Sequence, residues 1–227
     1  MSGAAPDRRL ATVELLGVLA YGQLRSFGAM SGAVRFAPDA RAADRIAAFA
    51  RREHDAYQLL HDHLAELTDL PTAAMDRQKG LFDQFFGRAP LDDWFGAIVF
   101  FAFGIPLARD FMRTVVPMLD PASGDVVLRT LQDRAEVEAA AIGLLRTELT
   151  SDALRERARS IVADLLGQAL TSFQQAAGDS DALSVLLEAE DDEASVEVRR
   201  LAMGLLSAHR GRLVELRLED PEDLSGD

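Results

Sequence analysis

The chain contains no cysteine among its 227 residues, which excludes disulfide bonds, thiol catalysis and cysteine-bound zinc. Positive charge is also scarce: 24 lysines and arginines stand against 37 aspartates and glutamates, for a formal net charge of −13. A protein with this charge repels phosphate backbones unless a local basic patch overrides its field. The arginines are scattered among acids, so the composition disfavours direct nucleic-acid binding.

Long apolar runs are missing as well. The longest run, Ala97 to Ala108, has 12 residues, whereas a membrane-spanning helix needs about 20. We therefore expect a buried core helix and no membrane association. The first residues, MSGAAPDRR, lack the basic-then-apolar order of a secretory signal, and the absence of cysteine suits a reducing compartment. A cytoplasmic location is expected on these grounds.

Helical periodicity fills most of the chain, and 48% of the residues are hydrophobic. We expect one all-α domain over residues 1–220, in which four helices of about 27 residues form a bundle and shorter helices pack on it. The acidic residues 221–227 are expected to be a flexible tail. The predicted helices cover residues 10–36, 40–68, 73–87, 91–118, 122–149, 152–177, 180–189 and 193–217.

Three of the four histidines, His54, His61 and His63, lie close together among acids and suggest a metal site. On a helical projection, however, Glu53 occupies the middle of the apolar stripe, and the three histidines lie about 80–100° to either side of it. They cannot converge on Glu53, and we interpret them as a solvated helix flank. His209, near the end of the last helix, is interpreted as complementing the helix dipole.

Other polar residues also fall on apolar helix faces. Gln23 lies in the centre of the stripe of the first helix, and Asp133 lies on one of two competing stripes in its helix. A buried carboxylate must find a cation, a metal or hydrogen-bond donors, or else take up a proton. For Glu53 the candidate partners are the amide of Gln23 and the guanidinium of Arg109 or Arg134, with protonation as the alternative.

The order and spacing of four segments resemble a known family. These segments are ELLGVLAYGQLRSF, AAFARREHDAYQLLHDHLAEL, LDDWFGAIVFFAFGIPLARDF and LQDRAEVEAAAIGLL. They resemble segments of actinobacterial ferritin-like proteins related to the tRNA hydroxylase that acts on methylthio-isopentenyladenosine. The resemblance implies a ferritin-like four-helix bundle with additional C-terminal helices. In di-iron bundles of this kind, one helix pair supplies a Glu and then an acid-x-x-His, and the second pair repeats the pattern.

Few of the ligand positions that the resemblance implies keep their residue type. The matching positions are Gln23, Glu53, Ala56, Ile105, Asp133 and Glu136. Both histidines are replaced, and two of the four carboxylates have become an amide and an isoleucine. Because metal affinity depends steeply on the number and type of ligands, we expect no di-iron centre, no metal ligand and no catalytic residue here.

Three functions stay open at this point. The first is a ferritin-like protein without a di-iron centre, acting as a binding or structural module, as a homodimer or with an unknown protein partner. The second is a hydroxylase or oxidase that uses iron at a non-standard site built on Glu53, Asp133 and Glu136. The third is an apolar pocket that binds a small ligand without turnover, although Phe100, Phe101 and Phe103 could fill the space that such a pocket needs.

Overall fold

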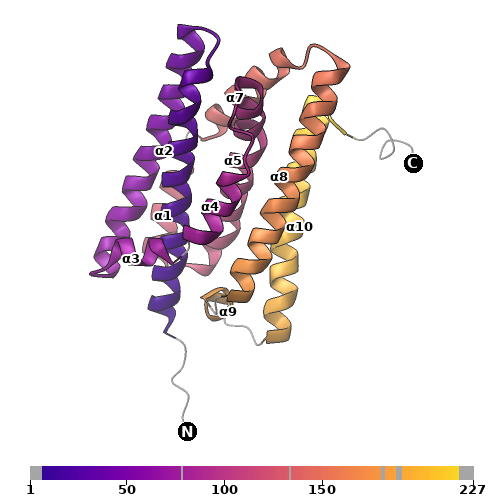
Figure 1. Ribbon diagram of the computed structural model, residues 1–227. Coiled ribbons are helices and arrows are strands. Elements are labelled where there is room, and N and C mark those ends of the chain that lie inside the picture. The colour runs from indigo at the N-terminus through magenta and orange to yellow at the C-terminus, as the bar shows by residue number, and fades with distance from the viewer. Residues whose placement is uncertain (1–6, 78, 133, 180–181, 188–190, 220–227) are drawn as a thin grey trace.

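Every regular element in the part of the chain that is described is a helix, as the sequence predicted (Figure 1). The computed structural model describes residues 7–77, 79–132, 134–179, 182–187 and 191–219. The α-helices are α1 (Arg8–Ala33), α2 (Ala40–Leu67), α3 (Pro71–Asp76), α4 (Lys79–Gly87), α5 (Trp94–Val115), α6 (Pro121–Thr130), α7 (Arg134–Glu148), α8 (Asp152–Asp179), α9 (Ala182–Leu187) and α10 (Asp191–Leu216), with two short 3-10 helices, η1 (Val34–Phe36) and η2 (Val116–Met118).

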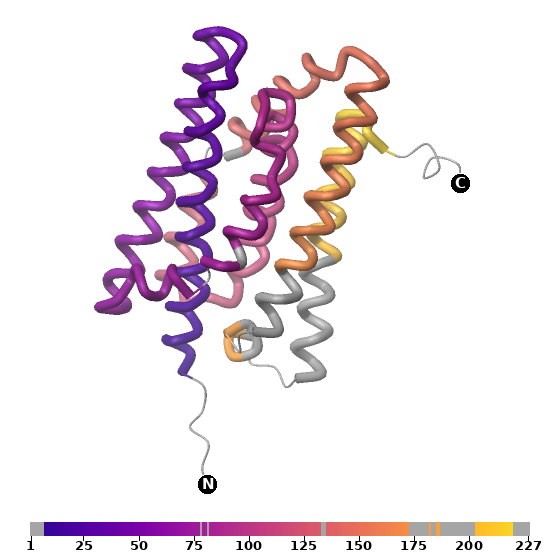
Figure 2. Tube along the Cα trace, viewed as in Figure 1, coloured from indigo at the N-terminus to yellow at the C-terminus, as the bar shows by residue number. Residues whose placement is uncertain are grey.

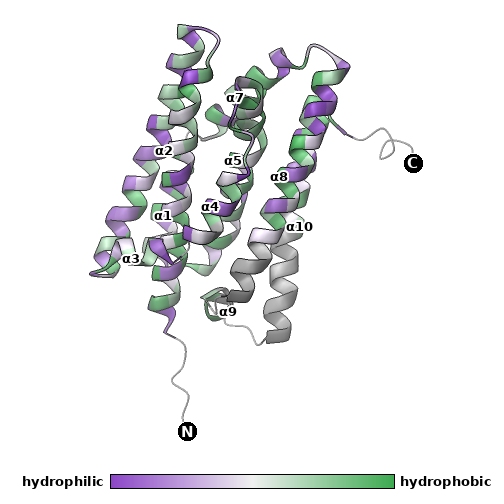
Figure 3. Cartoon of the chain, in the orientation of Figure 1, coloured by the Kyte–Doolittle hydropathy of each residue, from purple (hydrophilic) through white to green (hydrophobic). Residues whose placement is uncertain are grey.

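The first two long helices, α1 and α2, lie side by side and run in opposite directions (Figure 2). Each begins at an aspartate that caps its N-terminus. The Asp7 side chain accepts a hydrogen bond from the Arg9 N–H, and the Asp39 side chain accepts one from the Ala42 N–H. Apolar side chains at helical spacing, among them the fully buried Leu16, face the rest of the bundle, while the outer side of α2 is polar (Figure 3).

Helix α5 is the central rod. Asp93 caps it by accepting the Gly96 N–H at 2.8 Å, and α1, α7, α8 and α10 pack around it. Within the described residues, α5 with η2 is the one segment long and apolar enough to cross a membrane, and 89% of its most apolar window is buried inside the molecule. That degree of burial is typical of a core helix and agrees with the prediction for residues 97–108.

Two predicted helices are each divided in the structure. Residues 73–87 fall in α3 and α4, and residues 122–149 fall in α6 and α7. The second break begins where Leu131 and Gln132 donate to carbonyls three residues earlier, at Leu128 and Arg129, which tightens and ends the α-helix. The fourth rod of the bundle is therefore two shorter helices, with α6 against α2 and α7 against α5.

The C-terminal helices extend the bundle beyond four rods. Both α8 and α10 pack against α5, and α9 packs against α1. Arg212 fastens α10 to the core through two charged hydrogen bonds, to Asp110 of α5 and to Glu138 of α7, each at 2.6 Å. These contacts fit the predicted all-α bundle with additional C-terminal helices. The predicted tail, residues 221–227, lies outside the described residues.

Candidate functional site

The core of the candidate site is a buried ion pair between α2 and α5. Glu53 lies in the middle of the apolar face of α2, as its helical phase predicted, and is 0% exposed. Its Oε1 accepts a hydrogen bond from Nη2 of Arg109 at 3.0 Å, and Arg109 is itself 1% exposed. Arg109, one of the partners that the sequence suggested for Glu53, therefore does pair with it. The side chain of Arg134 lies outside the described residues.

Gln23 reaches the same helix from α1. Its side chain is buried, and its Nε2 lies 3.1 Å from the Sδ of Met112, three residues after Arg109 on α5. A thioether is only a weak acceptor, so this contact holds the amide in place with little electrostatic gain. Residues 109–112 of α5 therefore meet polar side chains from both α1 and α2.

Two of the other matched positions carry hydrocarbon. Ala56 lies about one turn after Glu53, and Ile105 lies about one turn before Arg109. Both side chains are buried, at 3% and 2% exposure. Neither can donate an electron pair to a metal, so each occupies interior space that a ligand side chain would otherwise take.

Glu136 points to solvent. Its side chain is 74% exposed and pairs with Arg52 at 3.0 Å, on the surface between α7 and α2. Asp133, the sixth matched position, lies outside the described residues. The structure thus buries Gln23, Glu53, Ala56 and Ile105, and it leaves Glu136 apart from them.

The described residues at these positions do not form the donor set of a di-iron centre. Two ferrous ions bring four positive charges and require several anionic oxygens together with imidazoles. Within the described ranges, no three His, Asp or Glu side chains come together in an arrangement that would hold a metal ion. Among the described members of the set, Glu53 is the buried acid, and it already has a guanidinium 3.0 Å away.

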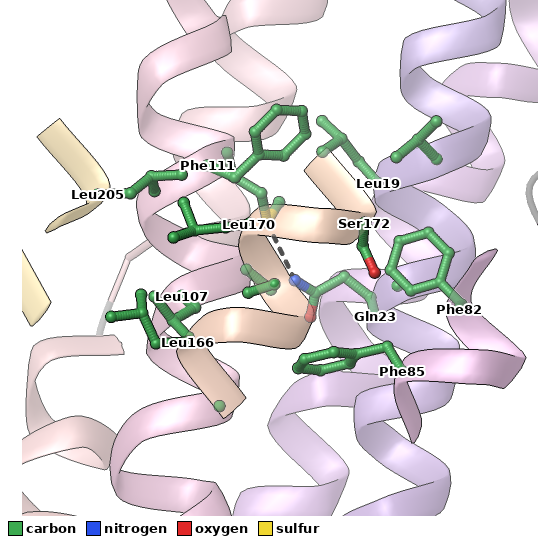
Figure 4. A pocket seen from close by; sticks show the side chains of 16 residues that line it. Leu19, Gln23, Phe82, Phe85, Leu107, Phe111, Leu166, Leu170, Ser172 and Leu205 are labelled. Atoms are coloured by element: carbon green, nitrogen blue, oxygen red, sulfur yellow. Dashed lines mark hydrogen bonds between the residues drawn. The ribbon is translucent and has the colours of Figure 1, made fainter. Parts of the chain in front are cut away.

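An apolar pocket of about 130 Å³ lies beside this polar core (Figure 4). Helices α1, α4, α5, α8 and α10 contribute to its wall. Gln23 and Ser172 are the polar side chains labelled there, and the Gln23 amide lies at the pocket wall with Met112. The labelled apolar lining consists of Leu19, Phe82, Phe85, Leu107, Phe111, Leu166, Leu170 and Leu205. Phe100, Phe101 and Phe103, which the sequence offered as side chains able to fill such a space, do not line this pocket and are buried in the core.

The histidines of α2 are less solvated than their flank position suggested. Rings of His54 and His61 lie on either side of Tyr57, with centroids 5.9 and 5.6 Å from its ring. The side chain of His63 is only 10% exposed, so its interpretation as a solvated residue is wrong. Helix α6 covers that side of α2, which a projection of one helix cannot reveal.

His63 is part of a serine–histidine–glutamate chain. Its Nδ1 lies 3.0 Å from Oε2 of Glu66, and its Nε2 lies 3.0 Å from Oγ of Ser123 at the start of α6. The order is that of a hydrolase triad, but Ser123 is 0% exposed and no substrate carbonyl can reach its Oγ. We therefore interpret the chain as a polar link between α2 and α6.

His209 also differs from its interpretation as a dipole-complementing residue. It is 2% exposed and stacks edge-on against Phe103 of α5, with ring centroids 5.5 Å apart. Burial, and then the positive charge of Arg212, lower the pKa of His209 from 6.5 to about 4. The imidazole is therefore neutral at pH 7. The network of Arg212 with Asp110 and Glu138, beside His209, was not recognised in the sequence.

These features define a class of protein: an all-α bundle of the ferritin-like type, whose core carries an acid–guanidinium pair between its second and central long helices. A family model described as "Ferritin-like domain, actinomycetes" matches residues 7–190, and the chain belongs to this family. No curated protein matches the sequence. The family confirms the predicted fold, while the narrower relation to the tRNA hydroxylase stays a prediction.

Proposed function

We propose that this ferritin-like protein works without a di-iron centre, as a non-catalytic protein that binds a small apolar molecule in the pocket beside Gln23. The observation that carries the proposal is the buried pair of Glu53 and Arg109. In this view the protein keeps the fold that it shares with the tRNA hydroxylase relatives and has lost their chemistry. A cytoplasmic location, and a homodimer or an unidentified protein partner, belong to the same proposal.

The charge of Arg109 supports the absence of a metal. A divalent ion that took Glu53 as a ligand would have to displace the guanidinium and so break the buried pair. Breaking a buried pair in this way costs about 3–5 kcal/mol. Ala56 and Ile105 offer no ligand in exchange, so the remaining oxygens would have to offset that cost alone.

The pocket supports the binding role. Its wall is almost entirely hydrocarbon, and its volume of about 130 Å³ is close to that of an engineered cavity of about 150 Å³ that stays dry and binds benzene. A pocket of this kind gains free energy by taking an apolar group out of water, at about 25 cal/mol per Å² of apolar surface.

The metal part of the proposal is tested by elemental analysis of protein produced in iron-supplemented medium. We expect iron far below one atom per chain and no absorbance band when ferrous iron and oxygen are added. Iron near two atoms per chain would overturn the proposal. Such a result would favour the hydroxylase alternative built on Glu53, Asp133 and Glu136.

The binding part is tested with benzene as the probe, followed by shifts of methyl resonances in the pocket. Ala169 lines the pocket, and Ala169→Leu should fill part of it and weaken benzene binding at least tenfold. Ala65→Leu, at an exposed position of α2, makes the same change away from the pocket and should leave binding unchanged. Equal affinity of both variants would refute the assignment of the pocket.

A further inference from the structure

Among the described residues that line the apolar pocket, Gln23 is the one with an amide side chain. Gln23 projects from α1 and Met112 lies on α5, so the two side chains meet where these helices approach each other at the pocket wall. Figure 4 shows the amide among the apolar lining side chains, with its nitrogen directed to a sulfur. A molecule held in the pocket therefore meets a hydrogen-bonding side chain as well as hydrocarbon.

The contact with Met112 identifies which end of the amide lies at this point. Nε2 of Gln23 is 3.1 Å from Sδ of Met112. A thioether sulfur is an acceptor, so an N–H faces it favourably, whereas the amide oxygen in the same place would set two acceptors against each other. Gln23 thus presents a donor here, and the acceptor that it meets is a weak one.

An oxygen acceptor can take the place of the sulfur. Met112 also lines the pocket, and the unbranched methionine side chain has three rotatable bonds, so its sulfur can turn aside at little cost. A carbonyl oxygen accepts a hydrogen bond more strongly than a thioether does. The exchange therefore favours a molecule that brings such an oxygen to Nε2 of Gln23.

The rest of the wall restricts what else this molecule can carry. Apart from Gln23 and Ser172, the labelled lining side chains are hydrocarbon, and a charged group against them would lose its hydration without gaining a partner. A carboxylate would also meet the field of a chain whose formal net charge is −13. An alcohol brings an O–H that the N–H of Gln23 cannot accept. A carbonyl group requires only the donor that Gln23 presents.

We propose that the ligand is a small apolar ketone or ester, whose hydrocarbon part fills the pocket and whose carbonyl oxygen accepts a hydrogen bond from Nε2 of Gln23 in place of the Met112 sulfur. The inference rests on the proposed function, because it names the class of molecule that the same pocket takes. It makes Gln23 a residue that determines specificity. The hydrocarbon part is about the size of benzene, as the cavity volume of about 130 Å³ requires.

Two probes of one shape test the inference. Cyclohexanone and methylenecyclohexane share the same ring, and an oxygen in the first stands where the second has a methylene group on the double bond. Nuclear magnetic resonance titration of the full chain, followed through methyl groups of the pocket, gives the dissociation constant of each probe. The ratio of the two affinities is then compared between variants, because the solvation of the free probes cancels in that comparison.

Variants on the two sides of the contact should shift this ratio in opposite directions. Gln23→Leu removes the donor and should weaken cyclohexanone about fivefold relative to methylenecyclohexane, the value of one neutral hydrogen bond. Met112→Leu keeps the volume, removes the competing acceptor and should favour the ketone by about two- to threefold. Gln58→Leu, at an exposed position of α2, is the control and should leave the ratio unchanged.

An unchanged ratio in folded Gln23→Leu would overturn the inference. If that variant does not fold, Met112→Leu decides, and a ratio that stays constant or moves against the ketone has the same consequence. The carbonyl ¹³C resonance of bound cyclohexanone reports the hydrogen bond directly. It should lie near its position in water with the unmodified chain, and it should move toward its position in a hydrocarbon solvent with Gln23→Leu.

Benzene binding separates this inference from the function on which it rests. If benzene binds and the ratio does not respond to Gln23, the apolar site stands and the carbonyl ligand is refuted. If the unmodified chain binds neither benzene nor methylenecyclohexane, both fail together. Far-ultraviolet circular dichroism and thermal unfolding of each variant confirm that lost binding does not reflect lost folding.

Discussion

The buried pair of Glu53 and Arg109 gives the most direct test of the site. The perturbation is a double-mutant cycle of Glu53→Leu, Arg109→Met and the two combined. Glu53 and Arg109 are 0% and 1% exposed, and the hydrogen bond between them is 3.0 Å long. Either single change removes one member of the buried pair and leaves the other in the core, whereas the double variant removes both charges and fills the space with hydrocarbon.

The expected changes in unfolding free energy follow from the cost of keeping a charged side chain away from water. Each single variant should lose about 3–5 kcal/mol of unfolding free energy, because removing one partner breaks a buried ion pair. The double variant should lie within about 1 kcal/mol of the unmodified protein, since hydrocarbon of similar volume often replaces a buried pair at no cost. The coupling free energy between the two positions is therefore large.

Urea unfolding followed by circular dichroism measures all four proteins. The pair Arg146–Glu215 is a matched control, because it has the same 3.0 Å separation and also joins two helices, but its side chains are 58% and 52% exposed. Its cycle should give less than about 1 kcal/mol of coupling. If the core cycle gave as little as the surface cycle, the buried pair would not compensate Glu53 and our reasoning would fail.

Two further predictions concern stability. The lowered pKa of His209, about 4 against 6.5 unfolded, means that the unfolded chain binds a proton that the folded chain does not. Unfolding free energy should fall by about 2 kcal/mol between pH 7 and pH 5; His209→Leu should remove this part of the loss, and the control His61→Leu should not. Gly96→Ala should destabilise by about 1–3 kcal/mol because the added Cβ would collide with the carbonyl oxygen of Pro90, whereas Gly143→Ala meets nothing within 4 Å and should stabilise by about 0.5–1 kcal/mol. Urea titrations at pH 5, 6 and 7 measure the first effect, and thermal unfolding ranks the two alanine variants; a destabilised Gly143→Ala would contradict the second.

The burial of the Glu53 and Gln23 side chains was predictable from the sequence, and the identity of their partners was only partly so. A long amphipathic helix fixes which of its own residues point inward, and both side chains are buried as their phase required. Which cation compensates Glu53 depends on how α5 lies against α2, and the sequence left Arg109 and Arg134 as alternatives. The packed structure places Arg109 within hydrogen-bonding distance of Glu53.

The fourth ligand pair illustrates a signal with two meanings. Asp133 and Glu136, three residues apart, match the acid-x-x-ligand spacing of a metal helix. The same spacing is also the sequence signature of a helix start, in which an aspartate precedes the helix and a glutamate follows in its first turn. Helix α7 begins at Arg134 and has Glu136 in that first turn. Giving weight to the second meaning would have predicted the division of residues 122–149.

The misjudged histidines show the limit of reasoning from one helix at a time. His63 and His209 both lie where a single-helix projection predicts solvent or a helix end, yet α6 covers one and α5 buries the other. Neither covering contact is local in sequence, since Ser123 is 60 residues from His63 and the ring that meets His209 is Phe103. Burial of this kind is set by tertiary packing.

The buried pair has a consequence for the pocket beyond its own stability. Hydrocarbon in place of Glu53 and Arg109 would stabilise the fold about as well, but a buried charge pair is costly to misalign, so it restricts how α2 and α5 can slide past each other. Arg109 lies three residues before Met112, and Met112 meets the Gln23 amide at the wall of the apolar pocket. We therefore expect this ion pair to help fix the register of the helix that forms this wall, which a core of interchangeable leucines would hold less strictly.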